Sequence, residues 1–222
     1  VLQQGSWSLL ESFGETDKSY WTLNEFNSSK RPVEFSFTGD KQFTCSIDQI
    51  GKHNIYNAMA AIAAARHAGV AVEESIRALG SFKGVKRRLE NKGEYRGITV
   101  YDDFAHHPTE IRCTLKAFSE HYPQQRIIVV FEPRSNTMQM GIHAGELKKA
   151  LSAATKLVVY DFGGLQWSIE DELNGMECKI LNDVDQIVDQ LIQILKPGDN
   201  VILLSNGGFG GLSAKLIKRL EA

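Results

Sequence analysis

Several features that would assign a protein to a special class are absent from this sequence. Its 222 residues contain no run of about 18 apolar residues, the length that a membrane-spanning helix needs. Acidic and basic residues almost balance, at 27 and 25, and the formal net charge is −2. Proteins that bind nucleic acid or membrane surfaces usually carry a basic excess. We therefore expect neither a nucleic-acid partner nor a membrane partner.

Cysteine is also scarce. The three cysteines, Cys45, Cys113 and Cys178, are odd in number, far apart and without metal-ligand spacing. This pattern predicts reduced structural thiols in a cytoplasmic protein. The rest of the composition, 42% hydrophobic and 23% charged, is that of an ordinary globular protein of one large or two small domains. Because the chain starts at Val1 in the middle of a pattern, we expect a piece of a longer protein.

Motifs for metal binding and nucleophilic catalysis are missing too. His106 and His107 could ligate a metal, but adjacent side chains diverge and no third ligand follows at helical spacing. No serine or cysteine lies in a nucleophile-elbow motif. We therefore expect no metal site among these residues.

The first part of the chain has the pattern of short strands followed by a buried helix. We predict strands at residues 21–23, 33–37 and 43–47. The helix opens near Gly51 and stops before Gly69. Asn54 and Asn57 are three apart and share one face of it, and an amide offers the donor and acceptor that can read an adenine edge. The alternative, that both amides only satisfy nearby backbone groups, stays open.

The second part of the chain alternates strands and helices. After a short helix at residues 72–79 we place a domain boundary near residue 82. We predict strands at residues 98–103, 127–131, 157–160, 179–181 and 201–204, and helices at residues 108–121, 142–153, 184–195 and 211–220. Short apolar strands joined by helices predict an α/β fold with a parallel, doubly wound sheet.

Polar residues directly follow three of these strands. The three clusters are Asp102-Asp103 with His106 and His107, the stretch from Glu132 to Asn136, and the loop that begins at Ser205. Ligands of doubly wound sheets gather at the carboxyl ends of the strands. We therefore expect the three clusters to converge on one rim and to form a binding site.

Five motifs together resemble the Mur ligase family, the ATP-dependent enzymes that form amide bonds in peptidoglycan assembly. They are residues 51–58 (Gly-Lys-His-Asn-Ile-Tyr-Asn-Ala), 87–90 (Arg-Arg-Leu-Glu), 101–110 (Tyr-Asp-Asp-Phe-Ala-His-His-Pro-Thr-Glu), 131–138 (Phe-Glu-Pro-Arg-Ser-Asn-Thr-Met) and 204–211 (Leu-Ser-Asn-Gly-Gly-Phe-Gly-Gly). The resemblance covers essentially the whole chain. It implies that residues 1–81 are the end of a central α/β ATPase domain. Residues 82–222 would be a Rossmann-like C-terminal domain with a mostly parallel, doubly wound sheet.

The resemblance also implies ATP and Mg²⁺ as cofactors and assigns roles to individual residues. Asn54 and Asn57 would contact adenine, Arg88 the phosphates and Asp103 the ribose, with His106 near the nucleotide. Arg88 and His106 are the catalytic candidates. Arg88 and Asp103 are expected to be solvent-accessible until the domains close. The chain lacks the family's Gly-Lys-Thr phosphate loop and upstream magnesium ligands, so we expect it to be inactive alone.

The motifs at 131–138 and 204–211 resemble more particularly those members that join UDP-N-acetylmuramate to a recycled murein tripeptide, L-alanyl-γ-D-glutamyl-meso-diaminopimelate. In this reaction the peptide amine attacks an acyl phosphate. The candidates to hold the peptide are Arg134, Asn136, Ser205 and Asn206. Three alternatives stay open: an L-alanine-adding ligase, a nucleotide-binding module without chemistry, and an Arg134 that only forms a surface ion pair with Glu132.

Overall fold

The computed structural model describes residues 10–16 and 18–222 of the chain. The chain divides into two compact units, Val1–Gly84 and Val85–Ala222. No helix in the described part of the chain is long and apolar enough to cross a membrane.

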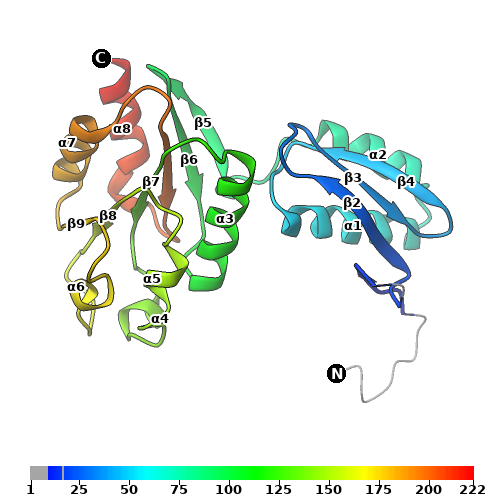
Figure 1. Ribbon diagram of the computed structural model, residues 1–222, viewed down its shortest axis with the longest axis horizontal. Coiled ribbons are helices and arrows are strands. Elements are labelled where there is room, and N and C mark those ends of the chain that lie inside the picture. Colours follow the sequence, from blue (N-terminus) through cyan, green and yellow to red (C-terminus); the bar gives the residue numbers. More distant parts are fainter. Residues whose placement is uncertain (1–9, 17) are drawn as a thin grey trace. The chain divides into compact units, whose positions relative to one another are not determined.

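The first unit is a small sheet covered on one face by two helices (Figure 1). Its strands follow one another in the order β1 (Phe13–Gly14), β2 (Trp21–Asn27), β3 (Val33–Thr38) and β4 (Gln42–Ile47). β1 is parallel to β2, and the other pairs are antiparallel. The helices are α1 (Lys52–His67) and α2 (Val72–Ser81).

Alternation of apolar and polar residues explains how this sheet buries one face. In β3 the side chains of Val33, Phe35 and Phe37 are buried, while the residues between them are not. Successive side chains of a strand point to opposite faces, so one face meets the helices. From α1 the buried side chains are Ile55, Ala58, Met59 and Ile62. The three strands and the helix predicted here are confirmed.

The second unit contains a six-stranded sheet with the order β5-β6-β10-β7-β8-β9. The strands are β5 (Glu90–Tyr95), β6 (Ile98–Asp103), β7 (Ile127–Phe131), β8 (Lys156–Tyr160), β9 (Cys178–Leu181) and β10 (Asn200–Leu204). Only β5 is antiparallel to its neighbour, so the sheet is mostly parallel, as predicted. Its helices are α3 (Pro108–His121), α4 (Asn136–Gln139), α5 (Leu147–Ala150), α6 (Ile169–Glu172), α7 (Val184–Ile194) and α8 (Leu212–Glu221).

Helices cover both faces of this sheet, which makes it doubly wound (Figure 1). On one face, α7 and α8 pack against alternate residues of the central strands, such as Val100, Ile128 and Val201. On the other face, Phe118 of α3 makes an edge-on ring contact with Tyr101 of β6, with centroids 5.1 Å apart. The central strands β7 and β10 are buried along their whole length, as expected for continuous apolar strands.

The predicted helix at residues 142–153 is wrong. The structure has instead the short helices α4 and α5 joined by turns. Gly145, inside the predicted range, has left-handed backbone with φ of 89°, which a regular α-helix does not contain, and Gly141 just before the range has φ of 71°. Gly141 lies against the indole of Trp167, which leaves no room for a side chain there.

Three further elements were missed by the sequence analysis: β1, β5 and α6. β5 has the polar sequence Glu-Asn-Lys-Gly-Glu-Tyr and shifts its register between Asn91 and Gly93, so it lacks the apolar alternation of a typical strand. The four-residue helix α6 is too short to show a period. The structure also has a 3₁₀ turn at Phe209–Gly211, and α8 begins after it.

Candidate functional site

The carboxyl ends of three neighbouring strands bring the predicted polar clusters together. β10 lies between β6 and β7, and Leu204 is paired with Asp103 on one side and with Phe131 on the other. The backbone N–H of Ser205 donates to the Asp103 carbonyl at 3.1 Å. The backbone N–H of Glu132 donates to the Leu204 carbonyl at 3.0 Å. The expected convergence of the clusters on one rim is confirmed.

Asp103 is buried at this rim, with 4% of its surface exposed. One carboxylate oxygen accepts a hydrogen bond from the backbone of Leu89 at 2.6 Å, and the other accepts from Ala105 at 2.7 Å. Burial raises the pKa of this carboxyl group, although both hydrogen bonds oppose the rise. The expectation that Asp103 is solvent-accessible is wrong, because the turn before it and the loop after it close over the carboxylate.

The arginine pair lies in a tight turn with unusual backbone. Arg87 and Leu89 both have left-handed conformation, with φ of 56° and 50°, which costs about 1 kcal/mol or more for such residues. Hydrogen bonds hold the turn: the Arg87 N–H donates to the Glu90 carboxylate at 2.9 Å, and the Arg87 carbonyl accepts from Phe104 at 2.7 Å. Arg88 is exposed on this turn, with its guanidinium 5.4 Å from the ring centre of Phe104.

Arg87, to which the sequence analysis gave no role, holds the rim together. Its guanidinium donates to the Ser205 carbonyl at 2.5 Å and lies 3.5 Å from a carboxylate oxygen of Asp102. It also stacks over the ring of Phe104, 5.2 Å from its centre. Nothing in the Arg-Arg dipeptide distinguishes the two side chains, because the difference comes from the fold of the turn.

The two histidines of the rim have different surroundings. Nδ1 of His106 lies 3.0 Å from the Phe104 carbonyl and 3.5 Å from the Glu110 carboxylate. Nδ1 of His107 accepts from the backbone of Thr109 at 3.2 Å and so caps the start of α3. Among the described residues there is no group of three or more His, Cys, Asp or Glu side chains that could hold a metal ion.

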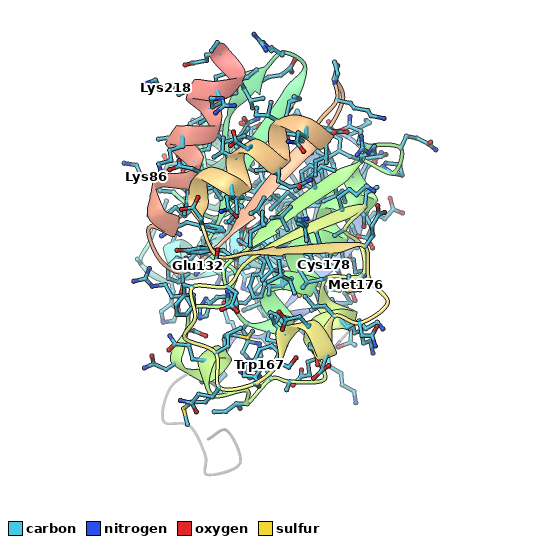
Figure 2. The ribbon with its side chains drawn as sticks, turned by 90° about the vertical axis from the view of Figure 1, so that its left-hand side faces the viewer. Lys86, Glu132, Trp167, Met176, Cys178 and Lys218 are labelled. Atoms are coloured by element: carbon cyan, nitrogen blue, oxygen red, sulfur yellow. The ribbon has the colours of Figure 1, made fainter. Side chains whose placement is uncertain are left out.

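Glu132, which is labelled in Figure 2, directly follows β7. It is a buried acid with only 2% of its surface exposed. It accepts a short hydrogen bond from the hydroxyl of Ser205, whose oxygen accepts in turn from the backbone of Gly207 at 2.9 Å. The guanidinium of Arg134 lies 3.7 Å from Glu132, and the Arg134 side chain is 55% exposed. The ion pair that was considered as an alternative for Arg134 is therefore present, and its acidic partner Glu132 is buried.

The other two candidates for holding the peptide lie beside this cluster along the chain. Asn136 is the exposed first residue of α4, which Ser135 caps by accepting from Met138 at 3.3 Å. Oδ1 of Asn206 is buried and has no hydrogen-bond partner among the described residues. Such an acceptor usually has a partner, so Asn206 has unused capacity for one more donor.

The asparagines expected to contact adenine belong to the first unit. They lie at the start of α1 and share a face, as predicted. Nδ2 of Asn57 donates to Oδ1 of Asn54 at 3.3 Å, and Nδ2 of Asn54 donates to the Ile50 carbonyl at 2.8 Å. Asn57 is the more exposed of the two. The backbone contact that was considered as an alternative is thus present for Asn54.

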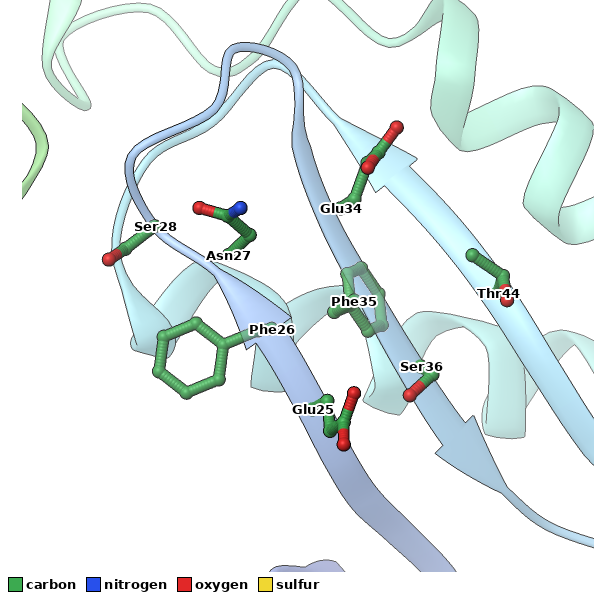
Figure 3. Close-up of a pocket in the computed structure, with 8 residues that line it drawn as sticks. All are labelled: Glu25, Phe26, Asn27, Ser28, Glu34, Phe35, Ser36 and Thr44. Carbon is green, nitrogen blue, oxygen red and sulfur yellow. The ribbon is translucent and has the colours of Figure 1, made fainter.

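The first unit also has an open hollow of about 480 Å³ on its sheet (Figure 3). Figure 3 shows the carboxylates of Glu25 and Glu34 and the ring of Phe26 around it. None of the residues predicted to have a function lines this hollow, and the chemistry expected from the sequence belongs to other parts of the chain. Size alone therefore does not make it a candidate site.

The second unit is a doubly wound α/β domain with charged side chains at the carboxyl rim of its sheet, the place where ligands of such folds usually bind. The family model of the Mur ligase glutamate ligase domain matches residues 87–207, and that of the Mur ligase middle domain matches residues 3–65. The chain belongs to the Mur ligase family. It spans about half the length of the relatives that it matches.

Three relatives illustrate the range of similarity. Over 99% of this chain, 39% of residues are identical to a UDP-N-acetylmuramate–L-alanyl-γ-D-glutamyl-meso-2,6-diaminoheptandioate ligase of Escherichia coli K12, of which 48% is covered. Over 82% of this chain, 34% are identical to a UDP-N-acetylmuramate–L-alanine ligase of Clostridium kluyveri, of which 42% is covered. The crystal structure of a murein peptide ligase from Psychrobacter arcticus has a TM-score of 0.73 and 32% identity, covering 99% of this chain and 48% of that one.

Proposed function

We propose that the full-length protein containing this chain is an ATP-dependent ligase of peptidoglycan recycling. It would join UDP-N-acetylmuramate to the tripeptide L-alanyl-γ-D-glutamyl-meso-diaminopimelate through an acyl phosphate. The observation that carries this proposal is the 39% identity to the E. coli ligase named for that peptide, which extends over 99% of the chain. The L-alanine ligase is the second candidate, since 34% identity over 82% of the chain also supports it.

In this proposal the arginine turn belongs to the nucleotide side. Arg88 contacts the phosphates, and its exposed guanidinium on a hydrogen-bonded turn supports this role. A guanidinium suits phosphate oxygens because its planar fork donates two hydrogen bonds at once. Asn54 and Asn57 contact adenine, and His106 lies near the nucleotide. Asp103 can reach a ribose hydroxyl only if the turn around it opens, since its carboxylate is buried.

The cluster around Glu132 belongs to the peptide side. Arg134 binds a carboxylate of the tripeptide, and Asn136 and Asn206 complete the contacts. Ser205 is only 1% exposed and its hydroxyl donates to Glu132, so it contributes by holding that carboxylate. The exposed guanidinium beside a buried acid and the unpartnered Oδ1 of Asn206 support this assignment. In the reaction, the peptide amine loses a proton and forms a bond to the acyl carbon, and phosphate leaves with the electrons of the broken C–O bond.

The phosphate loop and the magnesium ligands are proposed to come from the rest of the full-length protein. Phosphoryl transfer depends on positioning by a phosphate loop, a lysine and Mg²⁺. This chain therefore contributes half of the nucleotide site and is proposed to be inactive alone. UDP-N-acetylmuramate and ATP as substrates place the proposed enzyme in the cytoplasm.

The test of this proposal is the Arg134→Ala substitution in the full-length ligase. Truncating one partner of a desolvated charge pair costs about 2–5 kcal/mol. We expect the KM for the tripeptide to rise at least about tenfold, while the KM for ATP stays nearly unchanged. Because lysine cannot offer the planar fork, Arg134→Lys should recover little of the loss. Steady-state kinetics with each substrate varied in turn would measure both constants. Equal damage to ATP and peptide kinetics, or full rescue by lysine, would contradict the proposal.

A further inference from the structure

The side chain of Arg134 rests between a buried carboxylate and a glycine. We propose that Glu132 and Gly207 are positioning residues that fix the Arg134 guanidinium in the orientation that receives the peptide carboxylate. This inference rests on the proposed function. It adds two residues that touch neither the peptide nor the nucleotide in that function.

Glu132 fixes one side of the guanidinium. Its carboxylate is 2% exposed and lies 3.7 Å from Arg134, so it cannot follow the arginine into solvent. The hydroxyl of Ser205 donates to this carboxylate and thereby fixes its direction. Because Ser205 also accepts from the backbone of Gly207, the end of β7 and the loop after β10 are locked to each other.

Gly207 fixes the flat side of the same group. A Cβ atom at residue 207 would lie 2.7 Å from Cδ of Arg134, 3.0 Å from Nε and 3.1 Å from Nη1. The arginine therefore lies directly on the glycine backbone. Gly207 is not among the glycines with left-handed φ, so its backbone is open to residues with a side chain. The steric reason for a glycine at this position is the arginine itself.

A guanidinium held in this way is prepared for a carboxylate. Its five N–H donors lie in one plane, and the carboxylate of Glu132 and the backbone of Gly207 set the direction of that plane. The side chain remains 55% exposed, so its outer donors are accessible to a ligand. Fixing the fork before binding lowers the entropy cost of forming two parallel hydrogen bonds. A surface ion pair without function would not need a glycine beneath it.

A matched pair of glycine variants in the full-length ligase tests this inference. In Gly207→Ala the new methyl group displaces the arginine, which is flexible enough to move without unfolding the domain. The neighbouring Gly208→Ala is the control, because no atom lies within 4 Å of its added Cβ and its φ is −79°. We expect Gly207→Ala to raise the KM for the tripeptide at least about fivefold with the KM for ATP unchanged, and Gly208→Ala to stay within about twofold of the parent.

Two more measurements separate a positioning role from a merely structural one. Glu132→Gln keeps the shape and an acceptor for Ser205 but removes the charge. We expect it to raise the KM for the tripeptide by about the same factor as Gly207→Ala does, with a smaller change in kcat. In the 222-residue chain, the ¹⁵N–¹H signal of Arg134 Nε, identified by its loss in Arg134→Lys, should shift in Gly207→Ala and not in Gly208→Ala.

Each outcome decides between the inference and the function on which it rests. If Gly207→Ala behaves like Gly208→Ala while Arg134→Ala still weakens tripeptide use, the inference is overturned and the proposed function stands. If Gly207→Ala shifts the Arg134 signal but leaves the tripeptide KM unchanged, positioning of this arginine has no role in recognition and the inference is again overturned. If Arg134→Ala itself leaves tripeptide use intact, both are overturned.

Discussion

The neighbouring strands β7 and β10 have one buried acid at each edge of the sheet: Asp199 directly before β10 and Glu132 directly after β7. The two acids have different hydrogen-bond and ion-pair partners. At the amino ends of these strands, Asp199 is 2% exposed, forms an ion pair with Arg126 at 3.1 Å and accepts from the backbone of Lys196 at 2.8 Å. At the carboxyl ends, Glu132 is equally buried. It has a hydroxyl donor and an arginine that is no closer than 3.7 Å.

In the function proposed above, this difference separates a structural acid from an acid that positions a binding arginine. Both acids close the same two strands, which pair from Asn200 with Ile127 to Leu204 with Phe131. The chain itself satisfies Asp199 with close donors, so that end needs no ligand. Arg134, beside Glu132, is 55% exposed, so its outer N–H donors are accessible to a ligand. A buried acid whose arginine partner lies as far away as 3.7 Å gains little from the ion pair, and the proposed positioning of Arg134 would account for the arrangement.

The largest expected effect is on stability, from neutralising the amino-edge acid. Asp199→Asn replaces an oxygen that faces a donor by an NH₂ group and leaves Arg126 without its counter-charge. We expect a loss of about 3 kcal/mol in the free energy of unfolding. Glu132→Gln at the other end keeps the acceptor for Ser205 and should cost about 1 kcal/mol or less. Urea unfolding followed through amide signals of β10 measures both. Equal losses of unfolding free energy in Asp199→Asn and Glu132→Gln would show that the two acids do not differ in this way.

Asp103 tests what makes a buried acid important for stability: its position at one edge of the sheet or its hydrogen bonds. It lies at the carboxyl edge, like Glu132, but has two close backbone donors, like Asp199. We expect it to behave as a structural acid. Asp103→Asn turns an NH₂ group toward a backbone N–H and should cost about 1–3 kcal/mol at neutral pH. A loss below about 0.5 kcal/mol in urea unfolding would contradict this expectation.

The pH dependence of the same variant follows from the pKa of Asp103. Burial raises this pKa above its ordinary value of 3.8 in the folded state, so the native protein holds a proton that the unfolded chain releases. The stability contributed by this proton is fully present below pH 3.8 and is lost as the pH rises through the folded pKa. The stability advantage of the parent over Asp103→Asn should therefore be larger near pH 4 than at pH 7. A stability advantage of the parent over Asp103→Asn that increases with pH would contradict this prediction.

The smallest effect is expected from exchanging arginine for lysine at the amino edge. Arg126 contacts Asp199 through one nitrogen, and its side chain is 31% exposed, so lysine can replace the contact. We expect Arg126→Lys to cost about 1 kcal/mol or less and to leave tripeptide use unchanged. Arg134→Lys makes the same exchange at the carboxyl edge, and there we expect tripeptide use to be lost. Loss of tripeptide use in Arg126→Lys would show that the two edges are not distinct.

The sequence predicted the elements whose pattern is local. Apolar strands such as residues 127–131 and the helix at 108–121, which begins at Pro108, were predicted at their observed bounds. The sheet rim was also predictable, since the parallel order follows from the alternation of strands and helices. The broken helix at 142–153 was not, because the backbone N–H of Gly145 donates to the carboxylate of Glu172, a residue far away in the chain.

The roles of single rim residues depend on contacts that no spacing reveals. Arg87 and Arg88 are neighbours, yet one is tied to Ser205 and the other is exposed. Asp103 was expected to be accessible until the domains close, but the left-handed turn at Leu89 brings a backbone donor over it. The burial of Glu132 beside Arg134 likewise arises only when β10 places Ser205 next to β7.

The central claim is that the full-length protein selects a peptide amine rather than a single amino acid. The most direct measurement is turnover of the purified full-length ligase with ATP and UDP-N-acetylmuramate, with L-alanyl-γ-D-glutamyl-meso-diaminopimelate or L-alanine as the only amine. The account predicts phosphate release and a UDP-linked product with the tripeptide, and at least about a hundredfold lower kcat/KM with L-alanine. Comparable or faster turnover with L-alanine would contradict it and favour the alanine-adding relative.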